Sequence, residues 1–183
     1  TVSRIGIVYV TPEDLGWYPY VQSWMAREMK HVPEATQKHI LGLFEKAFEA
    51  PMNFVYKKLK EPVTTYPVQQ STNHCVIFQA LFNEKAPTKG HAGLNFASFD
   101  EATLNELATK VFVYALVWSV GVSNLNGFDA FNDYLRDFLS DEGINCGIPG
   151  LGTVYDYFVD LEKNEWVKFE SIIPSFKYSK ELP

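Results

Sequence analysis

The sequence predicts a mainly α-helical bundle with a short N-terminal strand and a C-terminal β-hairpin. Three observations carry this prediction. Apolar residues recur at helical spacing through most of residues 14–139, and residues 5–10 form a run that is apolar on both faces. Aromatic and polar residues alternate on both sides of a four-residue turn between 154 and 170, which is typical of two paired strands.

The composition is that of an ordinary globular domain. Of 183 residues, 46% are hydrophobic and 21% are charged, so the chain is long enough to bury a core without a disulfide or a metal. The formal net charge of −6 argues against a nucleic-acid partner, whose phosphates need a basic face. The longest apolar stretch, Val111–Val122, is about twelve residues long. A membrane span needs roughly twenty, so we expect no membrane partner.

Two features bear on the cellular compartment. Cys75 and Cys146 are the two cysteines, too few for a secreted disulfide scaffold and in keeping with a reducing compartment. The chain opens at Thr1 without a basic or signal-like apolar leader, so we expect no targeting segment.

The N-terminal run at 5–10 is typical of a strand buried on both sides of a parallel sheet. Such a strand needs hydrogen-bonded neighbours, and no parallel partner is evident before about residue 150. We therefore expect the chain to be cut from a larger protein whose sheet lies upstream. The alternative is a short strand that pairs with the C-terminal hairpin.

The first two helices follow from apolar periodicity. Residues 14–30 predict one helix with Pro19 in its first turn, where a missing N–H does no harm. Residues 33–59 carry a one-sided apolar stripe and predict a second helix, which Pro51 should kink.

Three more helices are predicted further along the chain. Residues 71–82 form the third, with Ser71, Thr72 and Asn73 as candidate N-caps. A capping box at 98–101 precedes the fourth. Because the fourth helix is almost wholly apolar from Val111 to Trp118, we expect it at the centre, surrounded by the others. The fifth is predicted at 126–139, with Phe128, Phe131, Leu135 and Phe138 facing inward.

Three segments result: a strand at 1–10, a helical domain at 11–140 and a final part at 141–183. The final part opens with four glycines and Pro149 between 143 and 152, which indicate a linker or a tight loop. The hairpin follows, its strands flanking the turn-type residues 162–165.

Catalytic and cofactor motifs are missing from the sequence. No glycine is followed by lysine, so there is no P-loop to hold phosphates. The four histidines lie in no metal-ligand spacing. Cys75 beside His74 is expected to be a core residue, and no basic residue adjoins Cys146 to lower its pKa. We expect no catalytic residue and no metal site.

Three blocks of residues, taken in order, resemble the dynein heavy chain, a motor with a ring of six AAA+ modules. The first block is Thr1-Val2-Ser3-Arg4 with Gly6-Ile7-Val8-Tyr9, Leu15-Gly16-Trp17, Pro19 and Ser23-Trp24. The second is Val117-Trp118-Ser119-Val120-Gly121, then Phe131 and Leu135-Arg136-Asp137-Phe138. The third is Val154-Tyr155-Asp156-Tyr157, Val159-Asp160 and Trp166, then Pro174, Phe176 and Tyr178.

The resemblance implies a place for each segment. Residues 1–10 resemble the closing strand of the second module's large subdomain, 11–140 its helical AAA+ lid, and 141–183 the linker and hairpin that lead into the third module. The Leu-Gly-Trp and Ser-Trp residues of the first block resemble those of ciliary dyneins more than those of cytoplasmic dyneins. The implied protein is an ATP-driven microtubule motor of the cytoskeleton, in a cilium or axoneme. The chain itself would be a non-catalytic lid and connector, whose partners are the adjacent modules and, through the parent motor, microtubules.

The resemblance also implies candidate nucleotide contacts, although ATP or ADP would be held by the parent module and not by this chain. Arg4 precedes the closing strand, where such modules resemble one another in aiming arginines at a neighbour's phosphates. Pairing with a carboxylate of the upstream subdomain is the alternative for Arg4. Ser71, Thr72 and Asn73 resemble a helix start that faces nucleotide, and plain helix capping is the alternative for them.

Two other functions stay open on the sequence. One is a free-standing helical scaffold domain that binds other proteins. The other is a small enzyme that uses Cys146 or the carboxylates of Asp129, Asp133 and Asp137, which recur every four residues. A solvated helix face explains those carboxylates better than an acid–base pair does.

Overall fold

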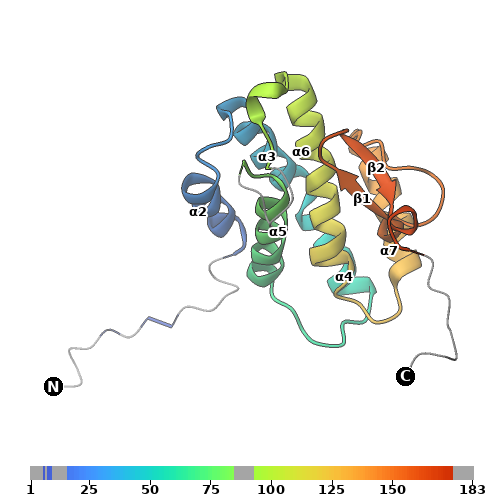
Figure 1. The fold of residues 1–183 in the computed structure, drawn as a ribbon. Helices are drawn as coiled ribbons and strands as arrows, with labels where there is room; N and C mark the ends of the chain where they lie inside the picture. Colours follow the sequence, from blue (N-terminus) through green and yellow to red (C-terminus); the bar gives the residue numbers. More distant parts are fainter. Residues whose placement is uncertain (1–5, 7, 10–15, 85–92, 175–183) are drawn as a thin grey trace, which may run out of the picture.

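The computed structural model describes residues 6, 8–9, 16–84 and 93–174 and shows a helical bundle with a hairpin docked on one side (Figure 1). The helices are α2 (Tyr18–Glu28), α3 (Glu34–Ala47), α4 (Glu49–Lys58), α5 (Pro67–Leu81), α6 (Glu101–Leu116) and α7 (Phe128–Asp141). The strands are β1 (Tyr157–Asp160) and β2 (Glu165–Lys168), which pair antiparallel. The predicted fold class, mainly α with a C-terminal hairpin, is confirmed.

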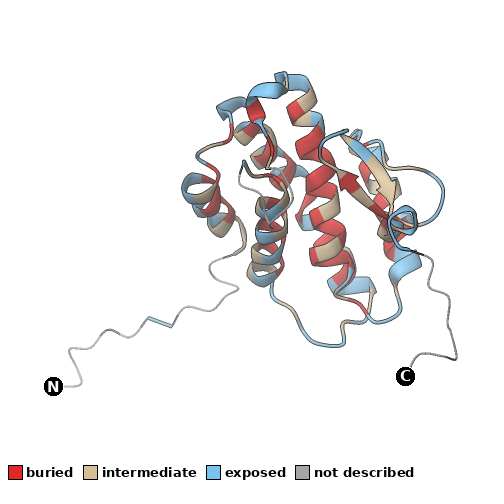
Figure 2. Ribbon diagram, viewed as in Figure 1, coloured by how far each residue is buried: buried red, intermediate tan, exposed pale blue. Residues whose placement is uncertain are grey.

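Helix α6 is the central element, as its apolar sequence predicts. It packs against α3 and α5 on one side and against β1 on the other (Figure 1). Nearly every residue from Leu107 to Leu116 is buried (Figure 2). The chain continues beyond α6 as a five-residue π-helix, Val117–Gly121, whose wider turn was not predicted. Of the described helices, none is long and apolar enough to cross a membrane.

The predicted kink at Pro51 is confirmed as a break between α3 and α4 at Phe48. Proline has no N–H to donate to the carbonyl of Ala47, four residues earlier, and its ring crowds that carbonyl. The chain therefore ends one helix and starts another, with Pro51 in the first turn of α4. Pro19 likewise lies in the first turn of α2, as predicted.

Several predicted helix boundaries are wrong. Helix α2 runs from Tyr18 to Glu28 and not from residue 14 to 30, and α7 begins at Phe128 and not at residue 126. Helix α5 begins at Pro67 and not at Ser71, because proline at the first position is preorganised for a helix and its preceding residue Tyr66 is extended. Helix α6 is capped by Asp100, whose carboxylate accepts a hydrogen bond from the Thr103 N–H at 2.7 Å. Ser98 belongs to a separate 3-10 turn, so the predicted capping box does not form.

Helix α7 confirms half of its predicted inner face. Phe131 and Leu135 are buried. Phe138 is half-buried, and Phe128 is exposed because it occupies the first turn, beyond the edge of the core. The helix also extends two residues further than predicted, to Asp141.

The N-terminal strand lies largely outside the described residues. Of the run at 5–10, Gly6, Val8 and Tyr9 are described, and all three are exposed and lie in no strand. The described sheet contains β1 and β2 alone, so the alternative in which this run pairs with the hairpin is not seen for these three residues.

His74 lies fully buried at the centre of the bundle. Four phenylalanine rings surround it with ring centroids 4.5 to 6.3 Å away: Phe44, Phe48, Phe78 and Phe112. Its Nε2 donates a hydrogen bond to the carbonyl of Phe112 at 3.1 Å. Burial lowers the pKa of His74 from 6.5 to about 3, so the side chain is neutral at physiological pH.

His74→Phe is expected to flatten the acid dependence of stability. Between pH 6.5 and 3 the unfolded chain binds a proton at His74 that the folded chain does not. The free energy of unfolding therefore falls as the pH drops, by up to about 1.4 kcal/mol per pH unit from this group. Urea unfolding of both proteins from pH 7 to 5 measures the difference. Equal slopes for the two proteins would contradict the assignment.

Candidate functional site at the junction of bundle and hairpin

Three segments meet at Gly121, the last residue of the π-helix. The carbonyl of Gly121 accepts hydrogen bonds from the Tyr155 hydroxyl at 2.8 Å and from the Asn124 amide at 2.6 Å. A Cβ on Gly121 would lie 2.5 Å from a ring carbon of Phe131 and 2.9 Å from the Tyr155 hydroxyl oxygen. Only glycine fits here, because helix α7 and the segment entering the hairpin both press against this backbone.

Two side chains of α7 bind the segment that enters the hairpin. The buried carbonyl oxygen of the Asn132 side chain accepts hydrogen bonds from the Val154 N–H at 2.9 Å and from Nε of Arg136 at 3.1 Å. Nη2 of Arg136 donates to the carbonyl of Gly152 at 3.2 Å. Because Val154 N–H is buried, losing its acceptor would leave a costly unpaired donor.

A capping box shapes this entering segment. The Thr153 N–H and hydroxyl both donate to the Asp156 carboxylate, at 2.6 and 3.0 Å. These bonds stabilise the ionised form and lower the pKa of Asp156. The resulting 3-10 turn, Val154–Asp156, aims Tyr155 into the bundle and leads directly into β1.

Aromatic packing fills the space between the bundle and the hairpin. The ring of Trp118 meets Tyr155 and Phe169 edge to face, at 6.3 and 6.1 Å between centroids. Phe128 also meets Tyr155 edge to face, at 5.2 Å between centroids. Burial raises the pKa of the Tyr155 phenol. Trp118 is partly buried and packs against the core, in agreement with the prediction that the apolar stretch ending at Trp118 lies inside the bundle.

The loop before the hairpin adds two hydrogen bonds. Nε1 of Trp166 donates to the carbonyl of Cys146 at 2.8 Å, and the Tyr157 hydroxyl donates to the carbonyl of Leu151. Trp166 pairs with Val159 across the hairpin, and Val159 is buried against the bundle. Both strands are therefore attached to the rest of the domain.

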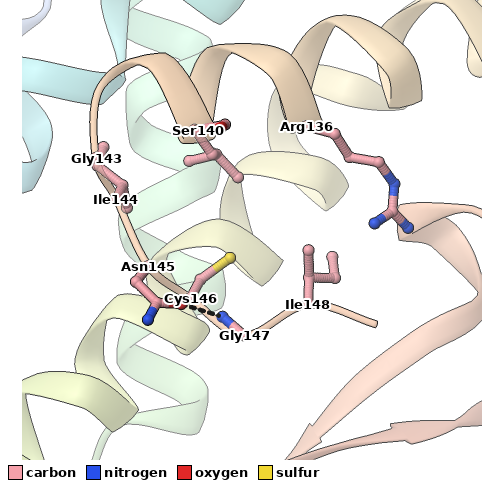
Figure 3. A pocket seen from close by; sticks show the side chains of 9 residues that line it. Arg136, Ser140, Gly143, Ile144, Asn145, Cys146, Gly147 and Ile148 are labelled. Atoms are coloured by element: carbon pink, nitrogen blue, oxygen red, sulfur yellow. Dashed lines mark hydrogen bonds between the residues drawn. The ribbon is translucent and has the colours of Figure 1, made fainter. Parts of the chain in front are cut away.

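A cavity of about 450 Å³ lies between the end of α7 and residues 143–148. Figure 3 shows the sulfur of Cys146 and the side chain of Ile148 directed into it, with Arg136 at its edge. The lining contains neither a histidine nor a carboxylate that could accept a proton from the thiol. Burial raises the pKa of Cys146, so the thiol stays protonated and is a poor nucleophile.

The other candidate residues are dispersed. Arg4 lies outside the described residues. Ser71 and Thr72 lie inside α5 and donate their hydroxyls to the carbonyl of Val68 at 2.9 and 2.7 Å. Asn73 is exposed one residue further along. None of the three caps the helix, so the capping interpretation is wrong, and their contact with a nucleotide stays a prediction.

The residues proposed for an enzyme do not form a site in the described chain. Asp129, Asp133 and Asp137 are exposed on the outer face of α7, the solvated face that their spacing indicates. Cys75 is buried in the core, where burial raises its pKa. Among the described residues, no group of three His, Cys, Asp or Glu side chains is arranged to hold a metal ion.

The described residues thus form a helical domain with a hairpin docked firmly on one side of the central helix. Comparison with known families agrees with this class. The sequence model described as "Dynein heavy chain AAA lid domain" matches residues 40–171. The chain belongs to this family of dynein heavy chain AAA lid domains.

Curated relatives are axonemal or ciliary dyneins. "Dynein axonemal heavy chain 6" and "Dynein axonemal heavy chain 2" of Homo sapiens are 32% and 33% identical over 185 residues. "Dynein beta chain, ciliary" of Tripneustes gratilla is 28% identical over 188 residues. Each alignment covers all of this chain and 4% of the relative, so the chain spans about 4% of their length.

The junction also gathers residues of the second and third blocks that carried the dynein resemblance. Gly121, Phe131 and Arg136 come from the second block, and Tyr155 and Trp166 from the third. Sequence reasoning gave none of them a functional role, because hydrogen bonds between distant residues leave no spacing signal. The sequence analysis did not single out Asn132. The signal that could have found it is its position directly after Phe131, near the predicted inner face of the helix, where a polar residue needs a hydrogen-bond partner.

Gly121→Ala is expected to destabilise the domain by about 1–3 kcal/mol, because the added methyl group has no space beside Phe131. Guanidinium unfolding monitored by tryptophan fluorescence measures this. Gly42→Ala is the matched control, since a Cβ at Gly42 in α3 meets nothing within 4 Å. The control is expected to stabilise by roughly 0.4–1 kcal/mol. A neutral Gly121→Ala would contradict the close packing at the junction.

Proposed function

We propose that this chain is the non-catalytic lid and connector of a dynein heavy chain, which couples the nucleotide state of one AAA+ module to its neighbour. The observation that carries the proposal is the attachment of the hairpin to the bundle. Asn132 binds the Val154 backbone and Tyr155 binds the Gly121 backbone, both inside a packed interface. Elements joined in this way move as one body, because close-packed interiors do not deform gradually.

A mechanical role also agrees with the chemistry of the described residues. The two thiols have raised pKa values, and the row of aspartates on α7 is exposed. The sequence contains no P-loop. ATP or ADP would then be held by the parent module, and this domain would pack against the bound nucleotide.

The wider context is proposed from the relatives. Their names describe axonemal and ciliary dyneins, and we place the parent protein in the axoneme of a cilium or flagellum. Its partners would be the adjacent AAA+ modules of the same heavy chain and, through the whole motor, microtubules.

Two groups are proposed to sense the nucleotide. Arg4 would reach the phosphates bound by a neighbouring module, where a guanidinium stabilises charge on the transferred group. Asn73 is the exposed member of the set Ser71, Thr72 and Asn73. The hydroxyls of Ser71 and Thr72 bond to the α5 backbone. The Asn73 amide would therefore be the group that contacts a bound nucleotide.

The 183-residue chain alone is expected to neither bind ATP measurably nor hydrolyse it. Isothermal titration with Mg·ATP and a phosphate-release assay test this directly. A dissociation constant in the micromolar range, or turnover that Cys146→Ser or Asp133→Asn abolishes, would favour the small-enzyme alternative over the lid.

In the full-length heavy chain, Asn132→Ala is expected to uncouple hydrolysis from motion. The variant leaves the Val154 N–H without its acceptor, at a cost of about 1–3 kcal/mol to the docked hairpin. ATP turnover should persist while microtubule gliding velocity falls several-fold. Asn126→Ala, at an exposed residue before α7, is the control and should glide normally. Unchanged gliding by Asn132→Ala would contradict the proposed coupling.

A further inference from the structure

Lys110 is a cation in the interior of the bundle. It lies on α6 between Leu107 and Val111, which are fully buried, and its own exposed fraction is 6%. Among the described residues it is the one buried Lys, Arg, Asp or Glu. An ammonium taken out of water is costly unless it is paired and hydrogen-bonded, so its partners indicate why it is there.

The ammonium has a full set of three acceptors. Nζ of Lys110 donates to Oε1 of Glu106 at 2.7 Å, to the backbone carbonyl of Asn164 at 2.6 Å and to the side-chain oxygen of Asn164 at 3.1 Å. Glu106 lies one turn earlier on α6 and is half exposed. Two of the three bonds therefore go to a residue 54 positions away, in the turn of the hairpin.

The hairpin turn is shaped to present Asn164. Residues 161–164 connect β1 to β2, and Asn164 has a φ of +54°, a left-handed conformation that asparagine tolerates better than most residues do. The carboxylate of Asp160 accepts hydrogen bonds from the N–H groups of Glu162 and Lys163, both at 3.1 Å. A turn ordered in this way holds both Asn164 oxygens in place for the ammonium.

We propose that Lys110 is the positioning residue that fixes the tip of the hairpin on the bundle. This inference rests on the proposed function, since it names a further point through which motion would pass. Asn132 and Tyr155 hold the base of the hairpin, and Val159 and Trp166 attach its strands. Lys110 adds an attachment at the turn, which these contacts do not hold directly. A two-stranded sheet is marginally stable by itself, so its orientation depends on such contacts.

Removing the ammonium leaves no buried charge behind, because Glu106 is half exposed and its carboxylate can bind water. A methionine at 110 also keeps an unbranched apolar stem in place of the lysine stem. Lys110→Met should thus leave the midpoint of global unfolding nearly unchanged and still release the tip. A purely structural lysine would instead change global unfolding and local opening together.

Hydrogen–deuterium exchange on the full 183-residue chain tests the proposal. In Lys110→Met, the backbone amides of β1 and β2 are expected to exchange about tenfold faster or more, while those of α3 and α5 keep their rates. Lys38→Met is the matched control. Lys38 has the same type of partner, Glu34 four residues earlier, but it is 73% exposed and should leave the hairpin unaffected.

A second variant guards against misfolding of the first. Asn164→Gly keeps the left-handed turn and its carbonyl but removes the side-chain oxygen, so the hairpin amides should exchange faster by a smaller factor than in Lys110→Met. Hairpin exchange at the wild-type rate in both variants would overturn the proposal. Because exchange is measured on the chain alone, this result is independent of coupling in the motor.

Discussion

The need to cover α6 on every side determines how this domain is built. All residues from Leu107 to Leu116 except Tyr114 are buried, and a helix that is apolar on nearly every side cannot meet water without a large free-energy cost. Helices α3 and α5 cover one side. The hairpin covers part of the other through β1, so it belongs to the core and is not an appendage.

This burial explains why the backbone of the segment entering the hairpin is paired with side chains of the bundle, although the indole N–H of Trp118 and the hydroxyl of Ser119 are buried there without a partner. Cys146 and Val154 are the buried residues of the segment between α7 and β1, and each buried N–H needs an acceptor. The side-chain oxygen of Asn132 is the acceptor for the Val154 N–H. In the same way, the Gly121 carbonyl accepts a hydrogen bond from the Tyr155 hydroxyl. The same bonds that satisfy the backbone also fix the direction of the hairpin, which links stability to the proposed mechanical role.

The accuracy of sequence reasoning varied with the range of the interaction concerned. The apolar run through Val111 identified the central helix, and Pro51 identified a break, because both signals are local. The start of α5 was misplaced because Pro67 begins the helix without any side-chain cap, and the start of α6 because Asp100 caps the helix in place of Ser98. Of the site, the sequence offered Gly121, Arg136 and Tyr155 as parts of a family resemblance, without their contacts.

By itself the sequence determined a helical bundle with a hairpin, its central helix and its kinship with dynein lids, because periodicity and motif order are recorded along the chain. Only the tertiary structure decided that Asn132 would meet Val154 and that Lys110 would meet Asn164. These partners lie 22 and 54 residues apart. Hydrogen bonds over such separations depend on how the elements pack, and packing leaves no period in the sequence.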